Sequence, residues 1–199
     1  MTANTQKRMN NLTDEASSLF ARLADGDLMI LGARPRLGKT QLGLGLAVEA
    51  MRSGRNGAFF TLVYSADEVF ALFETIGADA ADFGNVFKFD ASDRIDAAYI
   101  MAELAETPAG TVVVVDYLQL LDRKSENPEL SAQLGALKSF AAERGLIMVF
   151  LSQIDRSSVS TDGVCPTLED VRLPNPLDLS LFDKACFLSE NEMRFSAWN

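Results

Sequence analysis

Glycine, lysine and threonine follow an apolar run in the segment from Leu28 to Thr40, LMILGARPRLGKT. An apolar strand that leads through a turn into a helix is the usual setting of a phosphate-binding loop, whose main-chain N–H groups converge on phosphate oxygens. In such a loop Lys39 contacts the terminal phosphates and the Thr40 hydroxyl is a ligand of Mg²⁺. The helix expected from Lys39 to about Ser53 points its positive dipole end at the same anion. The segment therefore predicts binding of a nucleoside triphosphate with Mg²⁺.

One position departs from the usual pattern, because Ala33 stands five residues before Gly38, where glycine is common. Alanine has the smallest side chain that carries a β-carbon, so we expect the loop to close. The alternative is a chance Gly-Lys-Thr at the start of an ordinary helix, which the strand before it and the apolar stripe after it disfavour. The predicted nucleotide-binding residues are Ala33, Arg34, Pro35, Arg36, Leu37, Gly38, Lys39, Thr40 and Gln41.

A carboxylate follows the most strand-like run of the chain, TVVVVD, which ends at Asp116. The carboxyl ends of parallel strands meet at one edge of a sheet, so Asp116 should reach the same edge as the phosphate-binding loop. This is the position of a Walker B aspartate, which holds Mg²⁺ together with Thr40. The alternative is an aspartate that caps a turn after a strand.

Composition excludes several kinds of chemistry. The chain of 199 residues contains no histidine, which rules out histidine acid–base catalysis and histidine metal ligation. Its formal charge of −10 argues against a surface that binds nucleic acid through its overall charge. Cys165 and Cys186 are interpreted as a loop thiol and a core residue of a reduced intracellular protein. No apolar stretch is long enough to span a bilayer, so we expect a soluble, cytoplasmic protein without membrane contact.

Strand and helix patterns alternate along the chain and predict an α/β fold with a mostly parallel central sheet covered on both faces. Residues 1–12 are expected to form a polar tail and residues 13–199 a single domain. A helix should begin at Thr13 and end before Gly26, and Ser65 with Glu68 should form a capping box. Further strands are expected over 58–63, 86–90, 111–116 and 146–152, a helix from Asn127-Pro128 to Gly145, a long loop over 154–177, and an antiparallel hairpin over 184–198.

Three segments in order, GARPRLGKT, VVVVDYLQLL and FLSQIDRS, resemble the signature segments of the motor domain of DnaB-type replicative helicases. The resemblance spans about Gly26 to Ser158. It implies a three-layer, RecA-like P-loop ATPase core, in a small stand-alone version of a family that works as a ring threading single-stranded DNA. It also implies that Arg34 matches the family's A-R-P and that Lys39, Asp116 and Gln153 are the catalytic residues.

Gln153 would sense the terminal phosphate of ATP according to this resemblance. It ends a predicted buried strand, so its amide could bond a γ-phosphate and relay the loss of that phosphate to Asp155 and Arg156. The alternative is a polar strand end that caps backbone groups.

The resemblance breaks at Val63. In the family the corresponding strand ends F-S-L-E, and the glutamate polarises the attacking water, whereas this chain has FFTLVYS. Valine cannot accept a proton, so hydrolysis should be slow. Asp67 and Glu68 lie a helical turn further on, and Glu68 is already engaged in the capping box.

The DNA-binding parts of a helicase are only partly present. Arg123, Lys124 and Arg156 form a thin basic lining, so single-stranded DNA would bind weakly; solvated loop charges are the alternative. A collar domain is not expected, and Arg194 cannot be matched to the family's trans-acting arginine. The first interpretation is a DnaB-like ATPase that binds ATP and Mg²⁺ and assembles into a homo-oligomeric ring. The alternative is a nucleotide-gated module that binds a protein partner. A small-molecule kinase fits poorly, because no arginine-rich lid is visible.

Overall fold

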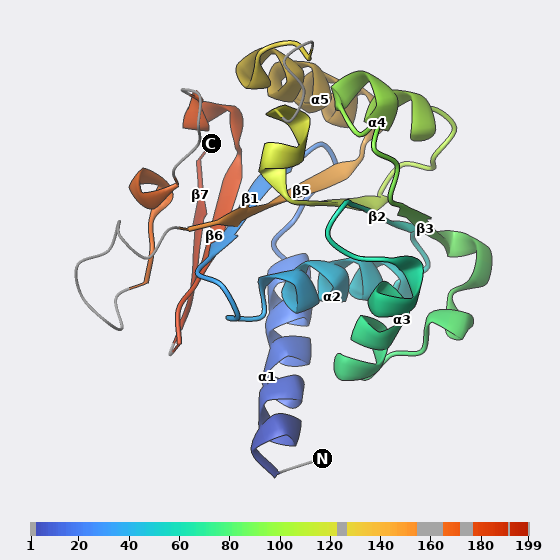
Figure 1. Cartoon of the computed structure of the whole chain (residues 1–199), viewed down its shortest axis with the longest axis vertical. Coiled ribbons are helices and arrows are strands. Elements are labelled where there is room, and N and C mark those ends of the chain that lie inside the picture. The colour runs from blue at the N-terminus through green and yellow to red at the C-terminus, as the bar shows by residue number, and fades with distance from the viewer. Residues whose placement is uncertain (1–2, 123–126, 155–164, 172–176, 191, 199) are drawn as a thin grey trace.

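A seven-stranded sheet forms the centre of the computed structural model, which describes residues 3–122, 127–154, 165–171, 177–190 and 192–198 (Figure 1). The strand order is β3-β2-β4-β5-β1-β6-β7. All neighbouring strands pair in parallel except β6 and β7, which are antiparallel. The strands are β1 (Leu28–Ala33), β2 (Gly57–Thr61), β3 (Phe87–Asp90), β4 (Val112–Asp116), β5 (Ile147–Gln153), β6 (Lys184–Leu188) and β7 (Met193–Ala197). The predicted fold class, including the C-terminal hairpin, is confirmed.

Helices cover both faces of the sheet (Figure 1). One face packs against α1 (Ala3–Phe20), α2 (Lys39–Arg52) and α3 (Ala66–Thr75), and the other against α4 (Ala97–Glu103), α5 (Leu130–Arg144) and the 3-10 turn η3 (Leu118–Asp122). Because neither face is left to solvent, β1, β2 and β4 are buried at every residue, as expected for central parallel strands.

Helix α2 is buried on more than the stripe that faces the sheet, because α1 lies across its outer side. Gly45 permits this close approach, since a β-carbon there would lie 2.9 Å from Cβ of Ala16. The helix carrying the phosphate-binding residues is therefore held between the sheet and α1.

The N-terminal prediction was wrong in its boundaries. Helix α1 begins at Ala3 and ends at Phe20, so residues 3–12 are helical and do not form a loose tail. These residues are polar and give no apolar period to detect, but a helix that is already packed gains one hydrogen bond for each residue added at its end. Gly26, at φ 94°, lies in a turn beyond the helix. The assignment of residues 13–199 to a single domain stays a prediction.

Most other boundaries agree with the sequence to within a few residues. The Ser65–Glu68 capping box is present, and Gly145 ends α5 in the left-handed conformation. β2 ends at Thr61, earlier than expected. Cys165, expected as a loop thiol, is buried, and its Sγ donates to the carbonyl oxygen of Phe187. Within the described part of the chain, no helix is both long enough and apolar enough to cross a bilayer.

Candidate nucleotide-binding site

The predicted phosphate-binding loop connects β1, which ends at Ala33, to α2, which begins at Lys39. Two residues of the turn adopt positive φ angles, Arg36 at 68° and Gly38 at 87°. Glycine adopts this conformation at little cost, whereas Arg36 is held in it against the preference of an L-residue. Gly38 is the N-cap of α2 and has no side chain to cap the helix. The start of α2 therefore suits an external anion as its capping group.

Lys39, Thr40 and Asp116 come together at the carboxyl edge of the sheet, although Thr40 and Asp116 are far apart in the sequence. The Thr40 hydroxyl donates to Oδ2 of Asp116 over 2.9 Å, and Nζ of Lys39 lies 3.5 Å from Oδ1 of the same carboxylate. Thr40 and Asp116 are buried, and the Lys39 side chain is only 15% exposed. One hydroxyl and one carboxylate at this distance are the oxygen donors that Mg²⁺ prefers, and the ammonium beside them suits phosphate.

Gln153 ends β5, between β4 and β1. Asp116 is level with Leu151 of β5, and Ala33 is level with Gln153 itself. Gln153 thus lies between the strand that carries the loop and the strand that carries Asp116, whereas the sequence had predicted only that its strand lies beside that of Asp116. It is exposed, unlike the residues before it in β5. Its role as a phosphate sensor stays a prediction.

Arg34 has a feature that the sequence could not reveal. Its Nε and Nη2 atoms are buried and have no hydrogen-bond partner. A guanidinium whose donors are withdrawn from water and left unpaired is costly, and an anion close to the loop would reduce that cost. Together with the donor set at Thr40 and Asp116, this orphaned cation fits a site that receives phosphate.

Val63 lies outside β2, two residues after Thr61, which is level with Asp116. Its side chain is 51% exposed, and its N–H donates to the buried Oγ1 of Thr61. Sequence reasoning had passed over Thr61, although a hydroxyl at the end of an apolar buried strand was a visible signal. The chain therefore presents an apolar side chain just beyond the strand that borders the Asp116 strand.

The nearby acids are poorly suited to replace a glutamate at position 63. Oε2 of Glu68 accepts hydrogen bonds from the backbone N–H of Ser65 over 2.8 Å and from the Ser65 hydroxyl over 2.9 Å. These bonds to the charged form lower the pKa of Glu68 and make it a poorer proton acceptor. Asp67 is exposed on the first turn of α3.

Known proteins share this architecture and sequence pattern. Residues 87–178 match the family model of the DnaB-like helicase C terminal domain. The replicative DNA helicase DnaB of Helicobacter pylori strain J99 is 27% identical over 179 residues, covering 74% of this chain and 37% of the relative. That of Geobacillus stearothermophilus is 29% identical over 191 residues, covering 80% of this chain and 41% of the relative. Over these stretches the chain is similar in sequence to the DnaB-like helicase C-terminal domain.

Solved structures support the same fold. One solved ATPase domain superposes with a TM-score of 0.67 at 18% identity, over 85% of this chain and 71% of that structure. A DnaB-like replicative helicase, described with its interactions with primase, gives a TM-score of 0.68 at 20% identity, over 84% of this chain and 49% of that structure. The resemblance to the DnaB-type motor domain is thus confirmed, while this chain spans less than half the length of the two DnaB relatives.

The described part of the chain leaves several residues of the DnaB-like resemblance untested. Arg123, Lys124, Asp155 and Arg156 lie outside the described residues. Arg194 is on β7, where Nη2 lies 2.8 Å from Oε1 of Glu192 in an exposed ion pair. The DNA-facing lining and the relay through the loop after β5 therefore stay predictions.

Proposed function

We propose that this chain is the ATP- and Mg²⁺-binding domain of a DnaB-like helicase, with slow hydrolysis because Val63 replaces the glutamate of the family. The observation that carries the proposal is the convergence of Lys39, Thr40 and Asp116 on one buried point, with distances of 2.9 and 3.5 Å. The DnaB-like relatives support the class of protein, and the orphaned Arg34 guanidinium supports an anionic ligand.

In this proposal the chain's own groups divide the work of binding. The main chain from Ala33 to Gln41 surrounds the phosphates, Lys39 neutralises the terminal ones, and Thr40 with Asp116 holds the metal. Bound Mg²⁺ would neutralise charge on the β- and γ-phosphate oxygens. Gln153, level with Ala33, would then hydrogen-bond the terminal phosphate.

Hydrolysis needs a group that orients and deprotonates water, and Val63 supplies none. Such groups contribute roughly 10²–10⁴-fold to rate. Since binding uses other residues, a protein that binds ATP and turns it over slowly is the expected result. DNA binding and assembly into a homo-oligomeric ring belong to the same proposal, with single-stranded DNA bound weakly because of the net charge of −10.

The test is the steady-state ATPase rate of the wild type and of Val63→Glu, with and without single-stranded DNA. We expect Val63→Glu to raise the rate at least about tenfold. Val63→Gln is the matched control, since glutamine has the size of glutamate but no carboxylate to accept a proton. Position 63 is half exposed, so both variants should keep the free energy of unfolding within about 0.5 kcal/mol of the wild type. Equal ATPase rates in all three proteins would refute the role given to position 63.

A second candidate is a nucleotide-gated interaction module without helicase activity. Two observations favour it: the charge of −10, and the exposed apolar residues Val63, before α3, and Phe70, within it, which are 51% and 44% exposed. Single-stranded DNA distinguishes the two. Salt-sensitive binding with stimulated ATP turnover supports the helicase-type ATPase, and nucleotide binding that is indifferent to DNA supports the module.

A further inference from the structure

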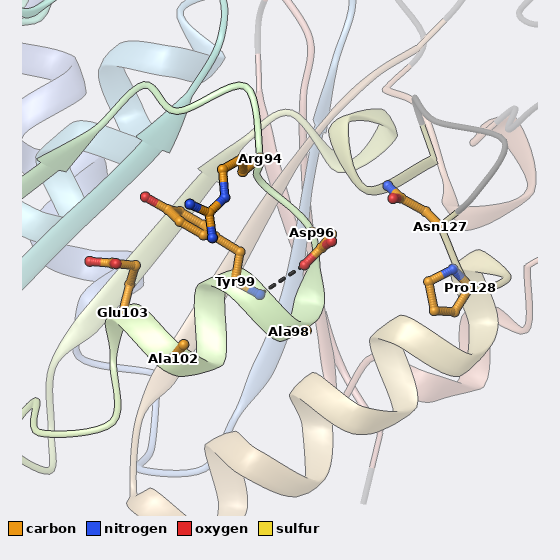
Figure 2. A pocket seen from close by; sticks show the side chains of 8 residues that line it. All are labelled: Arg94, Asp96, Ala98, Tyr99, Ala102, Glu103, Asn127 and Pro128. Atoms are coloured by element: carbon orange, nitrogen blue, oxygen red, sulfur yellow. Dashed lines mark hydrogen bonds between the residues drawn. The ribbon is translucent and has the colours of Figure 1, made fainter.

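A pocket lies on the other side of the sheet from α2, beside α4. It is an open pocket of about 670 Å³ whose lining includes Arg94, Asp96, Tyr99, Glu103 and Asn127 (Figure 2). The first four residues belong to α4 and the segment before it, and Asn127 approaches from the segment before α5. None of them belongs to the proposed nucleotide site, so this pocket has no role in the function described so far.

The aromatic ring in the pocket already carries a guanidinium. Cζ of Arg94 lies over the Tyr99 ring, 5.3 Å from its centroid, and the two side chains overlap in Figure 2. A tyrosine face attracts cations through its quadrupole. The Tyr99 hydroxyl donates to Oδ2 of Asp90 over 2.9 Å, which fixes the ring. The pocket therefore contains a fixed platform that accepts a planar cation.

The other polar side chains of the lining offer acceptor atoms. Asp96 caps α4 with Oδ1, which accepts from the N–H of Tyr99 over 2.8 Å. Glu103 bonds Nζ of Lys88 through Oε2 over 2.5 Å. Asn127 donates through Nδ2 to the carbonyl oxygen of Leu121 over 3.1 Å. In the described bonds each of these side chains uses one polar atom. The acceptors that remain are Oδ2 of Asp96, Oε1 of Glu103 and the amide oxygen of Asn127.

Among the residues that the structure describes, charge around the pocket is mainly negative. Asp93 precedes Arg94, Glu129 follows the lining residue Pro128, and both are exposed. With Asp96 and Glu103 they outnumber the cations Arg94 and Lys88. A phosphate would meet these carboxylates at close range, whereas a cation would be attracted.

We propose that this pocket binds an arginine side chain from a basic segment of a partner protein. The incoming guanidinium takes the place of Arg94 on the Tyr99 ring and donates to the carboxylate of Asp96, while the charge of Glu103 at the other end of α4 adds to the attraction. Arg94 is thus an internal stand-in that competes with the ligand. The site is independent of ATP, since it uses no residue of the nucleotide edge.

The test is a titration of the 199-residue protein with a capped tetra-arginine peptide. Chemical shift changes of the backbone amides, measured by NMR, give both the binding site and the affinity. The shifts should centre on α4 and the segment before α5. Replacing Tyr99 by Leu should weaken binding roughly two- to fivefold, while Tyr99→Phe, which also loses the Asp90 hydrogen bond, should bind as the wild type does. Arg94→Ala should tighten binding roughly twofold, because the competitor is removed.

A matched pair of double variants separates local charge from net charge. Asp96→Asn with Glu103→Gln should weaken binding roughly fivefold, and asparagine keeps the helix cap. The control combines Glu74→Gln on α3 with Asp79→Asn just after it, on the opposite face of the sheet. It changes the net charge by the same amount and should leave the affinity for the peptide unchanged. Equal affinities of the two double variants would overturn the proposal. So would weaker peptide binding by Arg94→Ala, or tighter binding of an oligothymidine than of the peptide at this pocket.

Discussion

The nucleotide edge and the loop after β2 lie close together but differ in almost every physical respect. At the nucleotide edge, polar groups are withdrawn from water and bonded to one another: Asp116 is 2% exposed and holds Thr40 and Lys39. In the loop after β2, Val63 is 51% exposed and makes its bond through the backbone. A buried charge is costly unless it has partners, and Asp116 has them in Thr40 and Lys39. Val63 carries no charge and is half exposed, so the loop after β2 needs no such partners.

This difference bears on the proposed function. The residues proposed to bind nucleotide are part of the packed interior, whereas Val63, proposed to slow hydrolysis, is a surface residue that can change without loss of the fold. Substitutions at the nucleotide edge should therefore change nucleotide binding or stability more than substitutions near the loop after β2. Equal effects in the two regions would contradict this view.

Replacing Asp116 by Asn should weaken binding of an unhydrolysable ATP analogue in Mg²⁺ by roughly 10–100-fold, as expected when a bond to a charged group is lost. Asparagine keeps an oxygen that can accept from Thr40 but removes the charge that holds the metal. Titrations with Mg²⁺ and with a chelator measure the effect. Without metal the variant should bind at least as well as the wild type, because Lys39 loses its carboxylate partner. Asp25→Asn, at an exposed ion pair, is the control.

Gly32→Ala should test the packing of the strand before the loop. A β-carbon at Gly32 would lie 2.5 Å from the Phe187 ring, which is 3% exposed. Overpacking of this kind costs about 1–3 kcal/mol of unfolding free energy. Denaturant unfolding measures it, with Gly135→Ala on α5 as a control, since no atom lies within 4 Å of the added carbon there. The control should gain stability, because alanine favours a helix interior more than glycine does. No loss of unfolding free energy in Gly32→Ala would show that this edge is not tightly packed.

Ser65→Ala should have the smallest effect, about 1 kcal/mol, because it removes an N-cap at the surface. The cap also predicts a pH dependence. Hydrogen bonds from Ser65 lower the pKa of Glu68 below its ordinary 4.5, so the stabilisation is present above that pH and is lost as pH falls through the folded-state pKa. The difference in unfolding free energy between wild type and variant should therefore shrink below pH 4.5. A difference that grows on acidification would contradict the assignment.

Much of the fold could be predicted because its signals are local. The strand β4 is indicated by the four valines before Asp116, the start of α3 by the Ser65–Glu68 capping box, and the end of α5 by Gly145. Each of these signals involves only neighbouring residues. The start of α1 could not be predicted, because its first residues have no apolar period and the helix depends on packing further along.

The sites divide in the same way. Lys39, Thr40 and Asp116 belong to contiguous motifs, so sequence alone predicted that they meet. The unpaired Arg34 guanidinium and the pocket around Tyr99 depend on tertiary packing, which joins α4 to residues 127 and 128 without any motif. Val63 was identified only because the family resemblance specified what should stand there.

Isothermal titration calorimetry of the wild type and Lys39→Ala with an unhydrolysable ATP analogue and Mg²⁺ tests the central claim most directly. Lys39 lies with Asp116 in the buried group, so we expect one site per chain and an affinity roughly 10–100-fold lower in the variant. Absence of binding heat from the wild type, or equal affinity in the two proteins, would contradict nucleotide binding at this edge of the sheet.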